Sequence, residues 1–267
     1  SSSTFTNNTW EVIEENNFGI NLVLLNNQLS IEADYYIRDT KNAIMPVFVP
    51  IINATIEQNS GEIRNQGIEL AIDWKKMVSP NFSYSIGTNF TTFNNKTLSL
   101  TDRKGYIDAG TAEFRQRTIV GEPIKSFYGY QTAGVYQNQA QVDADPIAVA
   151  NNLIPGDLIY KDSNNDGVID DSDRVVLGSY LPKFMYGGNI GLTYKDFDFS
   201  LSFYGQSGNK ILNRKRGEII FTSDTNMDAD LAINRWHGEG TSNSYPSSAG
   251  LRKGWNQKLS NFWIEDG

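Results

Sequence analysis

One segment of the sequence has the residue spacing of a calcium-binding loop. Residues 162–173 read DSNNDGVIDDSD, with oxygen-bearing side chains at loop positions 1, 3, 5, 9 and 12 and glycine at position 6. Alternate short oxygen side chains can surround one cation, glycine permits the sharp turn, and the backbone carbonyl of position 7 adds a ligand. The spacing therefore predicts a structural Ca²⁺ site with these ligands: Asp162, Asn164, Asp166, the Val168 carbonyl, Asp170 through a water molecule, and Asp173.

Two features of the loop define the kind of site we expect. Position 12 is Asp173 instead of glutamate, and the shorter side chain should weaken binding because it reaches less far as a bidentate ligand. No amphipathic helical pattern flanks the loop, so it is not an EF-hand sensor, and the ion would hold a long surface loop in place. The alternative is an acidic, asparagine-rich turn that stays hydrated without metal.

The rest of the composition argues against catalysis. The chain contains no cysteine, which excludes disulfides, thiolate zinc sites and thiol nucleophiles. Its single histidine, His237, has no nucleophile or metal partner at a recognisable spacing, and we interpret it as a surface-loop residue. No carboxylate pair stands out from the acidic background. We therefore predict no catalytic residue and do not expect an enzyme.

Charge and hydropathy exclude two further classes of protein. With 23 Lys and Arg against 31 Asp and Glu, the net charge of −8 makes nucleic acid an improbable partner. No run of about 18 apolar residues is present, which rules out a membrane protein built of spanning helices. Residues 1–10 carry neither a basic region nor an apolar core, so we see no signal peptide in them.

Strict alternation of apolar and polar residues is the strongest pattern in the chain. It predicts three β-hairpins with very short turns at 26–27, 78–80 and 195–196. Each strand spans about 9 to 11 residues, the length that crosses a bilayer when tilted. The apolar positions of the three hairpins are Phe18, Ile20, Leu22, Leu24, Leu29, Ile31, Ala33, Tyr35 and Ile37; Ile68, Leu70, Ile72, Trp74, Phe82, Tyr84, Ile86 and Phe90; and Tyr186, Gly188, Ile190, Leu192, Tyr194, Phe197, Phe199, Leu201 and Phe203.

Two all-β folds are compatible with this alternation. In a sandwich the apolar face packs on a second sheet, whereas in a transmembrane barrel it contacts lipid and the polar face lines the lumen. Short turns at one end and long loops at the other favour the barrel, and we expect long loops at 40–62, 94–117, 137–181 and 207–260. Aromatic residues near strand ends, among them Trp74, Tyr194 and Trp263, would then lie at the membrane interfaces.

A series of short phrases runs in order along nearly the whole chain: NQGIEL at 65–70, VGEP at 120–123, FYGY at 127–130, PGD at 155–157, YKD at 160–162, Leu177-Gly178, Pro182, Phe184, Tyr186-Gly187, DFDFSL at 196–201 and Arg235-Trp236. Together they resemble the C-terminal barrel half of SusC/RagA-type TonB-dependent transporters. Each phrase is weak alone, but their order and spacing make the set specific.

The resemblance implies a sector of a plugged outer-membrane barrel of roughly 22 strands with long extracellular loops. Residues 1–267 would be a segment of the TonB-dependent receptor barrel domain, about a third or less of the whole protein, with no plug or TonB box in this chain. Such a protein, in the outer membrane of a Gram-negative, Bacteroidota-type bacterium, imports nutrient oligosaccharides or peptides. Its implied partners are a SusD-like surface lipoprotein, TonB through a missing N-terminal part, the substrate, and outer-membrane lipid.

The competing hypothesis is a secreted β-sandwich that binds carbohydrate and is stabilised by calcium at 162–173. It predicts a soluble protein, whereas the transporter hypothesis predicts a chain that is insoluble without detergent. Under the transporter hypothesis, polar residues of the strands such as Glu32, Asp34, Glu69 and Asp73 face the lumen.

Overall fold

The computed structural model describes residues 8–49, 54–101, 104–110, 114–218, 229–248 and 253–267. Strands dominate, and the helices are short. The strands are β1 (Val12–Leu24), β2 (Leu29–Val49), β3 (Ala54–Ser79), β4 (Phe82–Thr92), β5 (Asn94–Leu100), β6 (Tyr106–Ala109), β7 (Gln116–Ile119), β8 (Ser126–Gly129), β9 (Thr132–Val135), β10 (Leu158–Tyr160), β11 (Val175–Gly178), β12 (Phe184–Tyr194), β13 (Phe197–Ser207), β14 (Lys210–Leu212) and β15 (Ile264–Asp266). The helices are α1 (Gln139–Ala144), α2 (Pro146–Ala150), α3 (Arg214–Glu218), α4 (Ala229–Asn234) and α5 (Lys253–Asn256), with 3-10 turns η1 (Asp171–Asp173) and η3 (Asn261–Trp263).

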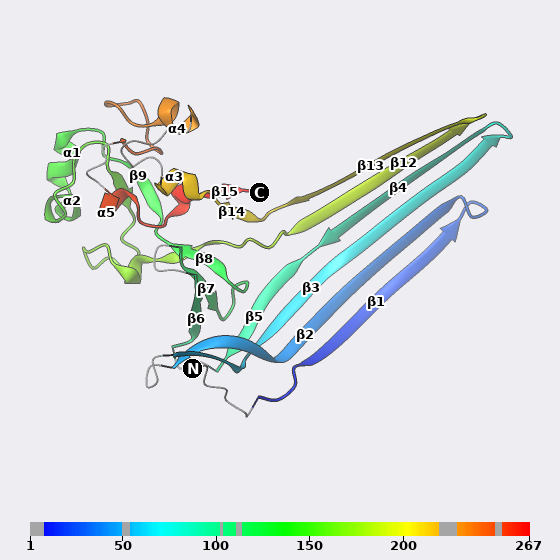
Figure 1. Cartoon of the computed structure of the whole chain (residues 1–267), viewed down its shortest axis with the longest axis horizontal. Helices are drawn as coiled ribbons and strands as arrows, with labels where there is room; N and C mark the ends of the chain where they lie inside the picture. Colours follow the sequence, from blue (N-terminus) through cyan, green and yellow to red (C-terminus); the bar gives the residue numbers. More distant parts are fainter. Residues whose placement is uncertain (1–7, 50–53, 102–103, 111–113, 219–228, 249–252) are drawn as a thin grey trace.

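The long strands form one antiparallel sheet in the order β1-β2-β3-β4-β12-β13, with β5 paired to the first half of β3. The three predicted hairpins are confirmed as β1–β2, β3–β4 and β12–β13. In Figure 1 these strands run as one wall, with the short turns at one end and the remaining elements gathered at the other. β12 lies beside β4 although residues 93–183 separate them in sequence.

The register aligns side chains of one kind across the whole wall. One row contains Leu24, Leu29, Trp74, Ile86, Ile190 and Leu201, and the adjacent row on the opposite face contains Val23, Ser30, Asp73, Gly87, Asn189 and Ser202. The apolar face is exposed in the described structure: Ile20 is 64% and Phe199 56% accessible. A sandwich would cover such residues with a second sheet, and because none covers them here, the wall has the pattern of a transmembrane barrel.

The predicted loop at 40–62 is wrong for the residues described. β2 and β3 stay paired as far as Val49 and Ala54, well beyond the part of the sheet where apolar and polar residues alternate. A bulge around Asn42, whose φ is +55°, shifts the register and interrupts the alternation that marks a strand in the sequence. Pro46 is tolerated because β1 pairs only as far as Lys41, which leaves this part of β2 at an edge.

The predicted loop at 94–117 is also partly strand. It contains β5 and β6 and the start of β7, and β6 pairs with β7. Beyond the apolar band, Ile107 of β6 packs with Ala43, Met45 and Val47 of β2 in a small buried cluster. The extended β2–β3 hairpin is therefore anchored by its own apolar contacts at the loop end of the wall.

The segments that follow β8 and β13 fold together into one globule at the loop end (Figure 1). Its core joins residues far apart in the chain: Tyr130, Val135, Tyr136, Val142, Ala148, Leu153, Leu158, Tyr160, Ile169, Leu231, Trp255, Leu259, Phe262 and Trp263. Trp263, expected at a membrane interface, is 3% exposed within this core, so that expectation is wrong. Among the described residues, no helix is both long and apolar enough to cross a membrane.

Candidate functional site

The acidic loop at 162–173 connects β10 to β11 on the globule, and its first carboxylate organises the turn. Asp162 Oδ1 accepts a hydrogen bond from the Asn165 amide at 2.6 Å, and Oδ2 accepts one from the Gly167 amide at 2.8 Å. Asn165 and Gly167 have φ of +60° and +82°, values that favour asparagine and glycine. The amides of Gly167, Asn165 and Asp166 hold the pKa of Asp162 below its usual range.

The middle of the loop is closed by side chains that bond to amides two residues ahead. Asn164 Oδ1 accepts from the Asp166 amide at 3.0 Å, and Asp166 Oδ1 accepts from the Val168 amide at 2.9 Å. The Asn164 amide group also donates to Asp166 Oδ2 at 2.8 Å. These are the short-range bonds that asparagine and aspartate form in turns.

Asp173 closes the loop across ten residues. It is fully buried, and its two oxygens accept from the amides of Ser163 and Asp170, each at 2.8 Å. Asp170 in turn caps η1, accepting from the Ser172 amide at 2.7 Å, which completes a capping box. Asp162 and Asp173 thus both bond to amides of the same loop, Asp162 near its start and Asp173 near its end.

The oxygens of this loop suit a hard cation, since they are carboxylate and amide oxygens with several lone pairs, although Asp162 already accepts three backbone amides. Within the described ranges, however, no three His, Cys, Asp or Glu side chains are grouped to hold a metal ion. The loop is instead closed by its own backbone amides.

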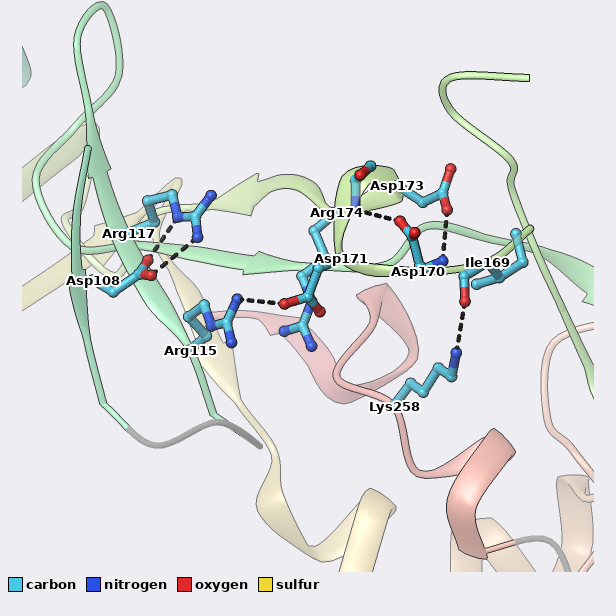
Figure 2. Close-up of polar contacts among 10 residues, drawn as sticks. Asp108, Arg115, Arg117, Ile169, Asp170, Asp171, Asp173, Arg174 and Lys258 are labelled. Atoms are coloured by element: carbon cyan, nitrogen blue, oxygen red, sulfur yellow. Dashed lines mark hydrogen bonds and ion pairs between the residues drawn. The ribbon is translucent and has the colours of Figure 1, made fainter. Parts of the chain in front are cut away.

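One cation from a distant part of the chain and one just after the loop pair with its outer side (Figure 2). Asp171 forms ion pairs with Arg115 at 3.2 Å and with Arg174 at 2.9 Å. Burial alone would raise the pKa of Asp171, but Arg174 and Arg115 outweigh it and hold that pKa below its usual value.

Lys258 is the third cation at the loop. Its ammonium donates to the Ile169 carbonyl at 3.2 Å and lies over the rings of Trp255, at 4.7 Å, and Tyr130, at 5.0 Å. Burial lowers the pKa of Lys258, and the nearby Arg174 lowers it further. Sequence spacing could not predict these contacts, because the cations at 115 and 258 lie far from the loop in the chain.

The remaining candidates from the sequence lie apart from this loop. His237 is exposed, with Nδ1 3.1 Å from the Arg235 carbonyl, which confirms its interpretation as a surface residue. Glu32, Asp34, Glu69 and Asp73 lie on the polar face of the wall, where Asp34 is directly opposite Glu69. The predicted division between an apolar face and an acidic, polar face is therefore confirmed.

The fold and its surface globule define the class of this protein: a sector of a β-barrel wall that carries structured loops. Residues 2–245 match the family model described as "TonB dependent receptor-like, beta-barrel". The chain belongs to this family, in agreement with the resemblance seen in the sequence.

Curated relatives support the same assignment. The chain is 30% identical over 265 residues, 97% of its length, to TonB-dependent receptor P3 of Formosa agariphila. It is 27% identical over 208 residues, 76% of its length, to TonB-dependent receptor SusC of Bacteroides thetaiotaomicron. It spans only 26% and 20% of the length of these two proteins.

Solved structures share the fold. The structure of the RagAB peptide transporter superimposes with a TM-score of 0.74 at 19% identity, covering the whole of this chain and 28% of the other. The RagAB peptide importer in its "open-open" state gives a TM-score of 0.73 over 97% of this chain. The fold is therefore that of a TonB-dependent barrel, of which this chain forms a part.

Proposed function

We propose that this chain is part of an outer-membrane active transporter that imports nutrient oligosaccharides or peptides. In this proposal the transporter works with a SusD-like surface lipoprotein and is energised by TonB. The observation that carries it is the two-faced wall: apolar rows exposed along one face and polar rows along the other, in a chain of the TonB-dependent receptor family. The apolar face contacts lipid, and the acidic, polar face lines the lumen.

The position of the globule supports a surface role for the long loops. It lies at the end of the wall opposite the short turns (Figure 1), and in barrels of this class short turns face the periplasm. The loops that build it would face outward and contact substrate and the lipoprotein. One similar structure is that of a peptide transporter, whereas the names of the curated relatives specify no substrate, so the proposal includes both peptides and oligosaccharides.

Because the chain spans only 26% and 20% of these relatives, we propose that it is one segment of a longer barrel protein. TonB would be engaged by a part of that protein outside these 267 residues. Import would be conformational, with no catalytic residue in this chain.

Fractionation of the source bacterium tests this proposal. An antibody raised against residues 137–181 should detect a band several-fold heavier than the 267-residue chain, confined to the outer-membrane fraction. A soluble or secreted band at the mass of the 267-residue chain alone would overturn the transporter proposal.

We also propose that the loop at 162–173 binds Ca²⁺, with Asp162, Asn164, Asp166, Asp173 and the Val168 carbonyl as ligands and Asp170 acting through water. The positive φ of Gly167 at position 6 and the carboxylate and amide oxygens that the loop presents support it. Dissociation constants of roughly 10⁻⁴ to 10⁻³ M are typical of extracellular calcium modules.

Calorimetric titration of the intact transporter with CaCl₂ tests the calcium proposal. We expect binding in the wild type, its loss in Asp162→Asn, and its retention in Asp143→Asn, which removes an exposed carboxylate on α1. Absence of binding at millimolar Ca²⁺ in the wild type, or equal binding by both variants, would exclude the site.

A further inference from the structure

The apolar face of the wall carries a cluster of aromatic rings beside the short turns. Phe82 and Tyr84 of β4 have ring centroids 6.3 Å apart, and Phe82 lies 6.4 Å from Tyr194 of β12. The register places Tyr84 in one row with Leu192 and Phe199, which belong to the apolar face. Tyr194 is 54% exposed, so these rings are not part of a packed core. Aromatic rings with a polar end favour the boundary between hydrocarbon and lipid headgroups.

Two lysines flank this aromatic cluster. Lys76 of β3 lies directly opposite Tyr84, so the two side chains extend from the same face of the sheet. Lys195, in the turn between β12 and β13, has its ammonium 5.5 Å from the centre of the Tyr194 ring. This turn is held to its neighbour, because the Lys195 amide donates to the Asn81 carbonyl at 2.8 Å. Two ammonium groups and two phenol hydroxyls therefore surround the cluster.

The charge of Lys76 is not neutralised by the wall. In the three rows of the apolar face nearest the short turns, the described residues include no Asp or Glu. Asp198 of β13 lies in a row of the polar face, and Asp196 follows Lys195 in the turn. No hydrogen bond or ion pair of the described structure engages the Lys76 side chain, which is exposed. The cluster therefore complements an anion, with Lys76 as the main source of charge.

The strands on both sides of Lys76 and Tyr84 belong to this chain. β3 pairs with β2 and β4, and β4 pairs with β3 and β12. Strands that complete a barrel would add beyond β1 and β13, and a plug would occupy the lumen, so neither would cover the apolar face at this position. In the proposed transporter, the surface around Lys76 is therefore the surface that meets the membrane.

The position of Lys76 along the strand sets its depth in that membrane. Its row is separated from the last row before the turns, that of Phe82, by two residues of β4, or about 7 Å along the strand. A charged side chain on the lipid face is costly at the bilayer midplane, but a long lysine near the interface extends its ammonium to the headgroups. Lys76 therefore reaches the level of the phosphates.

The chemistry around Lys76 suits a phospholipid. An ammonium and phenol hydroxyls donate hydrogen bonds to phosphate oxygens. One row further from the turns, Ile86 and Leu201 are each 48% exposed and offer an apolar surface on which acyl chains can pack. A free phosphate ion would use only the first of these two features.

We propose that Lys76, Tyr84, Tyr194 and Lys195 bind the phosphate of an anionic phospholipid in the periplasmic leaflet, whose acyl chains pack on the apolar rows. The inference rests on the proposed function, in which the apolar face contacts lipid and the short turns face the periplasm. It adds a lipid-binding site and the class of lipid that this site selects.

Trp74 provides a reporter for this site, because it lies on the same face two residues before Lys76 and opposite Ile86. The intact transporter would be placed in nanodiscs of phosphatidylcholine and phosphatidylglycerol, with one of the two lipids brominated on its acyl chains to quench tryptophan on contact. Subtracting the same measurement on proteins that also carry Trp74→Phe isolates the signal of Trp74. The ratio of quenching by the two lipids gives the preference for the anionic lipid.

We expect the wild type to prefer phosphatidylglycerol and Lys76→Met to lower this preference about fivefold. Lys75→Met removes the same charge from the adjacent residue, which lies on the polar face opposite Ser85, and should leave the preference unchanged. Lys76→Arg should retain it. Tyr84→Phe, which removes one donor and keeps the ring, should lower it by a smaller factor. The urea midpoint of each variant in liposomes checks that the barrel is folded.

The outcomes separate the lipid site from the transporter proposal. If both lipids quench Trp74 equally in the wild type, or if Lys76→Met and Lys75→Met lower the preference equally, the site is wrong while the lipid-facing wall stands. If millimolar inorganic phosphate abolishes the preference, the site binds a free anion and the lipid assignment is wrong. If neither brominated lipid quenches Trp74, the apolar face does not contact lipid and the proposed membrane barrel fails as well.

Discussion

Lys258 determines how firmly the acidic loop is attached to the globule. Its ammonium donates to the Ile169 carbonyl and packs on aromatic rings, yet burial lowers its pKa, so the surroundings disfavour its charge overall. The unfolded chain therefore binds this proton more tightly than the folded chain. The free energy of unfolding should rise as pH increases from the lowered pKa toward the ordinary value of 10.5.

We expect Lys258→Met to loosen the loop without unfolding the globule. The substitution removes one hydrogen bond and the cation–π contacts, which should lower the free energy of opening the loop by about 1 kcal/mol. The buried ammonium is itself unfavourable, so its removal offsets the lost contacts. The midpoint temperature of unfolding should therefore stay nearly unchanged. Hydrogen exchange of the intact protein should show faster exchange at residues 163–173 only. Lys161→Met, at an exposed position, is the control. Unchanged protection of the loop in Lys258→Met would show that Lys258 does not hold it.

Tyr136 makes the globule sensitive to alkaline pH. Its hydroxyl donates to Asp145 at 2.5 Å, and burial together with this carboxylate raises the pKa of Tyr136 above its ordinary value of 10.0. A raised folded pKa contributes stability that is complete below pH 10 and is lost as pH rises further, because only the unfolded tyrosine releases its proton there.

Tyr136→Phe should cost roughly 1–2 kcal/mol at neutral pH through the lost hydrogen bond. It should also remove part of the alkaline loss of stability, the remainder arising from Tyr130, Tyr160 and Tyr245, whose pKa values are raised as well. Urea unfolding between pH 7 and 11, followed by tryptophan fluorescence, measures both effects. Tyr180→Phe, which removes an exposed phenol hydroxyl, is the control. An identical alkaline slope in Tyr136→Phe and wild type would contradict this role.

At the scale of elements, the hairpins were predictable because alternation is a local pattern that the pleat converts directly into two faces. It fails at Asn42, where a bulge shifts the register, and the sequence beyond it looks like a loop although β2 continues. The pairing of β4 with β12 is not local and could not be predicted from alternation.

In the candidate loop, too, contacts between residues close in sequence could be predicted, whereas contacts from residues far along the chain could not. The turn from Asp162 to Asp173 could be predicted from the sequence, because hydrogen bonds within twelve residues form it. Arg115 and Lys258 reach the loop only through the folding of the whole globule. Their contribution therefore required the structure.

Adjacent residues on β13 test the two faces of the wall. Leu201 lies in an apolar row and is 48% exposed, while Ser200 faces the opposite side. Leu201→Arg should destabilise the intact barrel in lipid by about 2–4 kcal/mol if the row lies near the bilayer midplane. Ser200→Arg should cost less than about 1 kcal/mol, because its side chain enters the wet lumen. Urea unfolding in liposomes measures the difference, and equal costs would contradict the assignment of the faces.

At the scale of the whole molecule, the sheet ends in two strands that each pair on one side only. In the described structure β1 bonds to β2, and β13 bonds to β12. Unpaired amides and carbonyls cost several kcal/mol each in hydrocarbon, so neither edge can face lipid as it stands. In the proposed longer barrel, further strands would cover both edges, in line with the chain's 26% share of a curated relative.

If the wall closes into a barrel, the amide hydrogen exchange rates of the edge strands β1 and β13 depend on the rest of the protein. In the intact transporter, amides of β1 and β13 in the apolar band should exchange as slowly as those of β3 and β4, because pairing on both sides protects all four strands equally. In the 267-residue chain expressed alone, the same edges should exchange fast or drive aggregation, while the globule keeps its protection. Hydrogen exchange with mass spectrometry on both proteins in detergent makes the comparison, with β3 and β4 as the internal reference. Fast exchange at β1 and β13 in the intact protein would mean that the wall does not close, and the lumen assigned to its polar face would be lost with it.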